Sequence, residues 1–235
     1  MDLLLALGLG LLLGLQHATD ADHLAAVATL AAREHSLARA LRLGAAWGLG
    51  HSLTLLFVAG AVAGLGWVIS AQAAARFELL VGLLLVALGL RLAWRLRARR
   101  IHFHGHAHQG QSPHFHGHSH AAAAIPEGQA HASDPHRHEH RFPIGGLAVG
   151  MVHGLAGSAA LALLAGAALA TPAMQLAYIA VFGAGSLLGM AALTGAMAVV
   201  LRVTARRLAT LHHTLNIAVA CASVTIGLHL LWSAA

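Results

Sequence analysis

The chain has 235 residues, of which 58% are hydrophobic and only 9% are charged, and its mean hydropathy is +0.72. A soluble domain has about 25% charged residues, so this composition excludes an ordinary soluble enzyme. The net charge is +6, and all 14 basic residues are arginines that flank long apolar runs. This placement indicates orientation in a membrane rather than nucleic-acid binding. The single cysteine, Cys221, excludes a disulfide framework, a redox pair and a thiolate zinc site.

Six apolar segments are long enough to cross a bilayer, which needs about 20 apolar residues per helix. They cover residues 3–31, 44–68, 77–96, 144–169, 174–201 and 209–232. The first is interrupted by polar residues between His17 and His23. A cleaved signal peptide is the alternative, but the start lacks a basic residue and the apolar pattern resumes at Leu24. We therefore expect an all-α membrane protein whose first helix is broken by a polar motif.

The arginines predict the orientation of these spans. One side of the membrane, comprising the loops 1–2, 3–4 and 5–6 with their flanks, carries thirteen arginines, and the other side has only Arg76. Because cytoplasmic loops are enriched in arginine, we expect both termini outside the cytoplasm. The sequence thus predicts a multi-pass protein of the cell (inner) membrane. The thirteen are Arg33, Arg39, Arg42, Arg91, Arg95, Arg97, Arg99, Arg100, Arg137, Arg141, Arg202, Arg206 and Arg207.

The two halves of the chain contain similar motifs in the same order. The segments ending at His17 and His153 correspond, as do residues 47–52 with 182–186 and residues 89–94 with 227–232. The offset is nearly constant at about 136 residues. Because each repeat holds an odd number of spans, the second copy is inverted, as in many transporters. We expect a first three-helix repeat over 1–101, a loop over 102–142 and a second repeat over 143–235.

The loop between the halves is rich in histidine and has no apolar periodicity, so we expect it to be disordered without metal. Alternating histidines on a flexible chain suit nickel, cobalt, zinc and copper ions. A solvated spacer is the alternative. The candidates for metal capture are His102, His104, His106, His108, His114, His116, His118 and His120, and four more histidines follow at His131, His136, His138 and His140.

The polar motif of the first span places two carboxylates and two imidazoles at membrane depth, where each charge costs at least about 2.5 kcal/mol. No arginine lies within a span core to neutralise them, so the missing positive charge is a metal ion, a proton or both. At about 100° per residue, a regular helix presents His17, Asp20 and His23 on one face. Asp22 joins them only if the helix is broken, or it supports a ligand or carries a proton.

Further polar residues reach a similar depth on other spans. His51, with Ser52 and Thr54, lies about 11 Å from the cytoplasmic end of the second span, and His153 about 14 Å from the end of the fourth. They supply imidazole or hydroxyl groups to the ion pathway, or they serve helix packing. Glu78, His212, His213 and His229 lie near span ends, and Asn216 and Cys221 suit helix packing.

Residues 17–24, His-Ala-Thr-Asp-Ala-Asp-His-Leu, resemble the signature of the nickel/cobalt permease family, and Gly-His-Ser-Leu-Thr at 50–54 resembles its second motif. The resemblance implies high-affinity nickel or cobalt transport, with His17, Asp20, Asp22, His23 and His51 at the metal positions. Better-known permeases have eight spans with the signature in the second. The compact layout and the histidine-rich loop are similar to the urease-accessory-type branch and to nickel/cobalt efflux proteins.

The ligand types agree with this resemblance. Imidazole and carboxylate without thiolate suit nickel, cobalt or zinc, whereas calcium and magnesium need mostly oxygen ligands. No metalloprotease motif or ATP-binding loop occurs in the sequence, so gradients drive any transport. We predict a secondary transporter of nickel or cobalt, with zinc less favoured and no prosthetic group. The resemblance favours uptake. The alternative direction is efflux. The alternative classes of protein are a membrane-anchored metal buffer or metallochaperone, a small-anion exporter and a di-iron oxygenase. The expected partners are the bilayer and cytoplasmic nickel or cobalt enzyme-maturation proteins.

Overall fold

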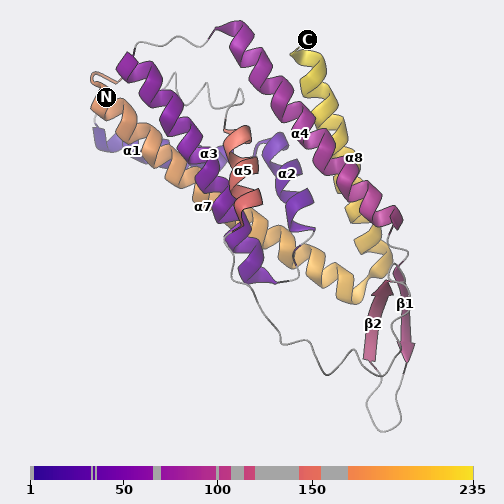
Figure 1. Ribbon diagram of the computed structural model, residues 1–235. Coiled ribbons are helices and arrows are strands. Elements are labelled where there is room, and N and C mark those ends of the chain that lie inside the picture. The colour runs from indigo at the N-terminus through magenta and orange to yellow at the C-terminus, as the bar shows by residue number, and fades with distance from the viewer. Residues whose placement is uncertain are drawn as a thin grey trace.

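The computed structural model describes residues 3–32, 34, 36–65, 70–98, 101–106, 114–119, 143–154 and 169–234. Helices account for most of these residues (Figure 1). Four of them are long and apolar enough to cross a membrane. In chain order the elements are α1 (Leu3–His17), α2 (Ala21–Ala31), α3 (Leu37–Leu65), α4 (Ala71–Ala98), β1 (Ile101–His106), β2 (His114–Ser119), α5 (Ile144–His153), α7 (Pro172–Arg207) and α8 (Ala209–Ser233).

The first predicted span is broken, as the sequence indicates. Helix α1 ends at His17, and α2 begins at Ala21 after a bend of 58°. The chain turns at the break because the amide of Thr19 bonds the carbonyl of Gln16, and that of Asp20 bonds the carbonyl of His17. Together the two helices are apolar enough for one bent span or a re-entrant segment. The break places the polar motif between two helix ends.

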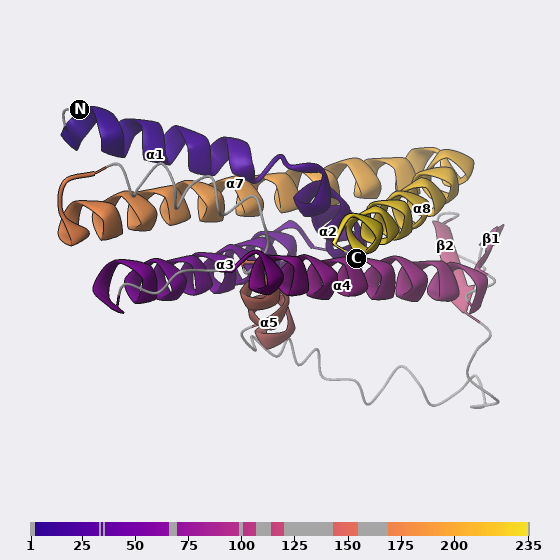
Figure 2. The same ribbon diagram turned by 90° about the horizontal axis from the view of Figure 1, so that it is seen from above.

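The long helices lie side by side. Helix α1 lies along α7, and α3 lies between α7 and α5, whereas α4 lies along α8 (Figures 1 and 2). The short helix α2 contacts α3, α4, α7 and α8, and α5 contacts α3 and α4. Helix α2 is therefore enclosed by the long helices and is buried along most of its length, whereas α5 lies against one side of α3 and α4 and buries only Gly146, Gly150 and His153 (Figure 2).

Glycines bring several pairs of helices into backbone contact. A Cβ atom on Gly14 of α1 would collide with the carbonyl of Phe182 in α7, and one on Gly150 of α5 would collide with the carbonyl of Trp47 in α3. Membrane helices use such small residues to approach at backbone distance. The buried face of α1 consists of Ala6, Gly10, Gly14 and His17, and the first three of these follow the same rule.

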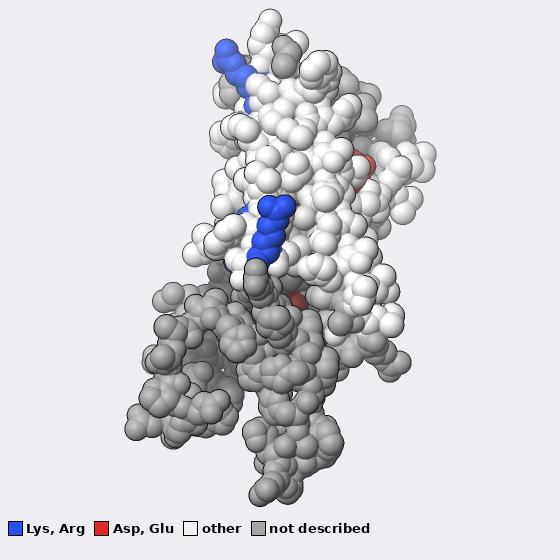
Figure 3. All heavy atoms as spheres, turned by 90° about the vertical axis from the view of Figure 1, so that its right-hand side faces the viewer, with Lys and Arg blue, Asp and Glu red and all other residues white. Residues whose placement is uncertain are grey.

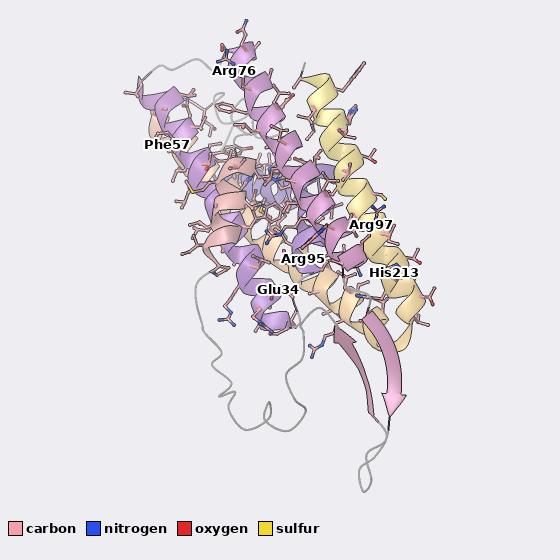
Figure 4. The ribbon with its side chains drawn as sticks, turned by 45° about the vertical axis from the view of Figure 1, so that its right-hand side comes forward. Glu34, Phe57, Arg76, Arg95, Arg97 and His213 are labelled. Carbon is pink, nitrogen blue, oxygen red and sulfur yellow. The ribbon has the colours of Figure 1, made fainter. Side chains whose placement is uncertain are left out.

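Much of the outer surface is apolar. The face seen in Figure 3 is almost free of charged residues between its arginines. Large side chains such as Leu4, Phe57 and Trp232 are 78%, 75% and 84% exposed. Such a surface suits lipid and not water. Figure 4 shows Arg76 at one end of α4, with Arg95 and Arg97 toward the other end.

The helix bounds differ from the predicted spans. Helix α3 begins at Leu37 rather than at residue 44, α4 begins at Ala71 rather than at residue 77, and α7 runs on to Arg207. These extensions contain arginines, and hydropathy measures only the apolar part of a helix. The predicted span 144–169 is described as α5 and a few flanking residues, and the rest of it lies outside the described residues.

The expectation that the whole histidine-rich loop lacks regular structure is wrong for two segments. Strands β1 and β2 form an antiparallel hairpin in which His102 pairs with His118, His104 with His116 and His106 with His114. The alternation of histidine with other residues has the two-residue period of a strand, and this period accounts for the pairing. The hairpin adds a small two-stranded sheet to the helical protein. His108, His120 and residues 131–140 lie outside the described residues.

Candidate metal centre

Four buried histidines from four helices converge where α1 ends and α2 begins. His17 is 6% exposed, and His23, His51 and His153 are each 1% exposed. The ring centroid of His23 lies 4.5 Å from that of His17, 5.2 Å from that of His51 and 4.3 Å from that of His153. His17, His23 and His51, all predicted as ligands, thus lie together, and His153 joins them.

Two carboxylates orient these rings. His17 Nδ1 donates to Asp20 Oδ2 at 3.0 Å, and His23 Nδ1 donates to Asp22 Oδ1 at 3.0 Å. The other oxygen of Asp22 accepts a hydrogen bond from His153 Nε2 at 2.9 Å. Carboxylates that hold one ring nitrogen fix the tautomer and leave the other nitrogen for a metal. Asp22 reaches the cluster because the helix is broken.

The carboxylates differ in exposure. The Asp20 side chain is 39% exposed, and that of Asp22 is 17% exposed. Asp20 precedes the first residue of α2, and its carboxylate makes no capping bond. It lies behind His17 and belongs to neither group of possible metal ligands. In this arrangement Asp20 supports a ligand.

Several imidazole nitrogens in the cluster have no partner. His23 Nε2, His51 Nδ1 and His153 Nδ1 are buried without a hydrogen bond. His17 Nε2 lies 3.1 Å from His51 Nε2, a contact between two nitrogens that supplies at most one hydrogen bond. Buried polar atoms without partners are rare in folded proteins, so this cluster suits a cation.

Two overlapping groups could each hold an ion. The first comprises His17, His23 and His51, and the second comprises Asp22, His23 and His153. Within each group the potential ligand atoms lie within 4.8 Å of one another. Imidazole and carboxylate are ligands for nickel, cobalt and zinc.

Two aromatic rings border the cluster, and the sequence analysis does not predict either of them as part of the site. The ring of Trp47 lies 5.5 Å from that of His23 and 5.6 Å from that of His153, and the ring of Phe182 lies 5.3 Å from that of His17. Trp47 and Phe182 occupy matching positions in the two similar halves, and this correspondence is the feature of the sequence that could have indicated their place beside the cluster. The fully buried Ser186, whose hydroxyl has no hydrogen bond, matches His51 in the same alignment.

The predicted hydroxyl groups serve helix packing in this structure. Ser52 Oγ lies 2.8 Å from the carbonyls of both Gly48 and Gly183, to which it can donate. Thr54 Oγ1 donates to the carbonyl of Met151 at 3.1 Å. Both residues join α3 to a neighbouring helix beside the cluster.

The remaining polar candidates lie away from the cluster. Asn216 in α8 donates to the carbonyl of His212 at 2.8 Å, which is a local contact. Cys221 is exposed, as is His229. No side chain of the loop histidines is among those that the structure describes.

Comparison with known proteins identifies relatives of this chain. Residues 3–232 match the family described as high-affinity nickel-transport protein. The chain belongs to this family. It is also 30% identical over 234 residues to the urease accessory protein UreH of Bacillus sp. (strain TB-90), covering 99% of this chain and 93% of the relative. No solved structure matches the chain.

Family membership confirms the resemblance carried by residues 17–24 and 50–54. With the four long apolar helices, it identifies the chain as an integral membrane protein of a nickel-transport family. The polar cluster is thus buried within a membrane transporter.

Proposed function

We propose that this protein carries nickel and cobalt ions across the membrane through the buried cluster of His17, Asp22, His23, His51 and His153, with Asp20 supporting His17. The observation that carries the proposal is the convergence of four buried imidazoles on a carboxylate at a helix break, with nitrogens left unpartnered. An ion supplies the charge that a buried carboxylate needs.

The ligand types favour nickel and cobalt over other ions. A group of three imidazoles, or of two imidazoles and a carboxylate, is too poor in oxygen for calcium or magnesium and has no thiolate for copper(I). Zinc fits the same ligands, and the family's description favours nickel over it. The ion is the transported substrate and no prosthetic group is needed.

We further propose six spans arranged as two inverted three-helix repeats. Matching contacts support this arrangement: Gly14 meets Phe182 as Gly150 meets Trp47, and these residues correspond in the two halves. A second set agrees, because Gly50 approaches the carbonyl of Leu147 and Gly185 approaches that of Leu11. Inverted repeats that meet at a midplane site are a common transporter architecture.

The proposed orientation places both termini outside and residues 102–140 in the cytoplasm. Arg76 lies at the opposite end of α4 from Arg95 and Arg97 (Figure 4), which supports a charge bias along the bundle. The ion pair between Arg39 and Glu34, 3.9 Å long, precedes the apolar part of α3 and is compatible with the cytoplasmic side.

Uptake is the direction that we propose. The family's description specifies high affinity, which suits capture of a scarce external ion and is not needed to expel an abundant one. The relative is named a urease accessory protein, so a cytoplasmic maturation protein for a nickel enzyme is the proposed recipient. The histidine-rich loop would then receive and buffer the ion.

The test is nickel-63 flux in oriented vesicles that contain the purified protein. We expect saturable nickel uptake that cobalt inhibits strongly, zinc weakly and magnesium not at all. Vesicles without protein give the background. A metal buffer would bind nickel without moving it into the lumen, and this result would refute the proposal.

A further inference from the structure

The two groups of possible ligands share one residue. His23 belongs both to the group with His17 and His51 and to the group with Asp22 and His153. We propose, resting on the function proposed above, that the cluster holds two overlapping ion positions that share the ring of His23 and are filled one at a time.

The first position has three imidazoles. His17 Nε2 and His51 Nε2 are 3.1 Å apart. Two nitrogens bound to one metal at about 2.1 Å, at right angles, lie about 3 Å apart, so this spacing already fits an ion. Asp20 keeps the proton of His17 on Nδ1, which leaves Nε2 free to bind.

The second position has a carboxylate. Asp22 lies between His23 Nδ1 at 3.0 Å and His153 Nε2 at 2.9 Å, so one residue holds rings from α2 and α5. Exchange of these hydrogen bonds for bonds to an ion requires the proton of each ring to move to its other nitrogen, and His23 Nε2 and His153 Nδ1 have no partner that would prevent this. His153 thereby brings the second half of the chain into the pathway.

His23 cannot serve both positions at once. A neutral imidazole has one protonated nitrogen and one lone pair. In the structure Nδ1 faces Asp22 and Nε2 has no partner. The lone pair on Nε2 is therefore available to an ion that His17 and His51 also bind. Binding through Nδ1 requires the proton on Nε2 instead. Passage to the second position thus moves the proton of His23 from Nδ1 to Nε2 and that of His153 from Nε2 to Nδ1, and each ring keeps one proton.

The exposure of the carboxylates suggests the order of filling. Asp20, beside the first position, is 39% exposed, whereas Asp22 in the second position is 17% exposed. An ion from solvent therefore reaches the three imidazoles first and passes to Asp22 and His153 afterwards. His153 is then needed for the second step and not for the first binding step.

Trp47 provides a local probe of both positions. Its ring lies 5.5 Å from that of His23 and 5.6 Å from that of His153. In the full-length protein, the other tryptophans, Trp67, Trp94 and Trp232, are replaced by phenylalanine, and quenching of Trp47 fluorescence by Ni²⁺ is titrated. Nickel flux is measured on the same variants in vesicles, with His229→Gln as the matched control because His229 is exposed and away from the cluster.

We expect His51→Gln to keep saturable quenching, with half-saturation at about 10- to 100-fold higher nickel. His153→Gln should keep quenching with half-saturation near that of the wild type, because the first position is intact. Both variants should lose flux. His23→Gln should lose both quenching and flux. Size-exclusion profiles and helical circular dichroism check folding, and His153→Asn replaces His153→Gln if the latter misfolds.

Other outcomes separate this inference from the proposed function. If His51→Gln or the folded His153 variant alone abolishes quenching, the cluster is one position and the inference is wrong. If the folded His153 variant transports nickel at the wild-type rate, the second position is not on the pathway and only the inference fails. If the wild type neither quenches nor transports, the proposed function itself fails.

Discussion

Asp22 Oδ2 accepts a hydrogen bond from His153 Nε2 at 2.9 Å, although 131 residues separate the two in the chain. The same carboxylate accepts from His23 through its other oxygen. One side chain at a helix break thus connects the two halves of the protein. Removal of its charge should affect both histidines, which makes Asp22 the most informative carboxylate to change.

We predict that Asp22→Asn lowers nickel flux by at least about 10-fold while the protein still inserts into the membrane. Each hydrogen bond to a charged group contributes about 1.5–3 kcal/mol, and the neutral amide also offers the ion no charge. Nickel-63 flux in vesicles measures the effect. The control is Glu78→Gln, which removes a carboxylate from α4 outside the cluster. Equal flux in the two variants would exclude a role for the Asp22 charge.

We predict that Gly14→Ala destabilises the protein by about 1–3 kcal/mol, because a methyl group there collides with the backbone of Phe182. Gly8 on the same helix has no atom near its potential Cβ, so Gly8→Ala is the matched control and should be neutral. Thermal unfolding in detergent, followed by loss of the monodisperse peak, compares the two. Equal midpoints would show that α1 and α7 are not in backbone contact.

The sequence predicts which polar residues lie together better than it predicts the helix bounds. The break between His17 and Ala21 follows from polar residues inside an apolar run, and it explains why Asp22 lies beside His23 and His153. The early start of α3 was missed because Arg39 and Arg42 end the apolar run without ending the helix.

Other features depend on contacts that no local pattern encodes. The role of Trp47 needs the positions of three helices, and a tryptophan in an apolar run reads as ordinary packing. Ser52 and Thr54 were candidates for the pathway, but the carbonyls that they contact belong mainly to other helices. The pairing of β1 with β2 shows the opposite case, in which a visible two-residue period was interpreted only as metal capture.

Labelling tests the predicted orientation. In a Cys221→Ser background, a cysteine placed within residues 107–113 should be inaccessible to a membrane-impermeant maleimide in intact cells, and one at Ser233 should be labelled. The reason is the arginine bias between the two ends of the bundle. Labelling of the loop cysteine from outside would overturn the orientation and, with it, the inverted repeat.

Deletion of residues 102–140 should leave transport active. Most of this loop has no core-forming pattern, and the helices on either side can be joined by a short flexible connection. Initial nickel uptake should stay within about twofold of the wild type, while retained nickel falls. Complete loss of flux in a correctly inserted deletion would place the loop in the pathway itself.

The same loop should release its metal when the pH falls. Unperturbed imidazoles have a pKa near 6.5, and protonated imidazole does not bind metal, so nickel held at pH 7 should be lost near pH 5. Equilibrium dialysis of the wild type and of the loop deletion separates this fraction from ions held in the bundle. Loop-dependent binding that is equal at both pH values would rule out imidazole ligation.

The most direct test of the central claim compares His23→Ala with His229→Ala in nickel-63 flux through oriented vesicles, at equal amounts of inserted protein. His23 is shared by both groups of ligands, whereas His229 is an exposed histidine of α8. The account predicts that His23→Ala reduces flux to the level of protein-free vesicles and that His229→Ala transports like the wild type. Wild-type flux in His23→Ala would contradict the claim that the ion crosses the membrane through the buried histidine cluster.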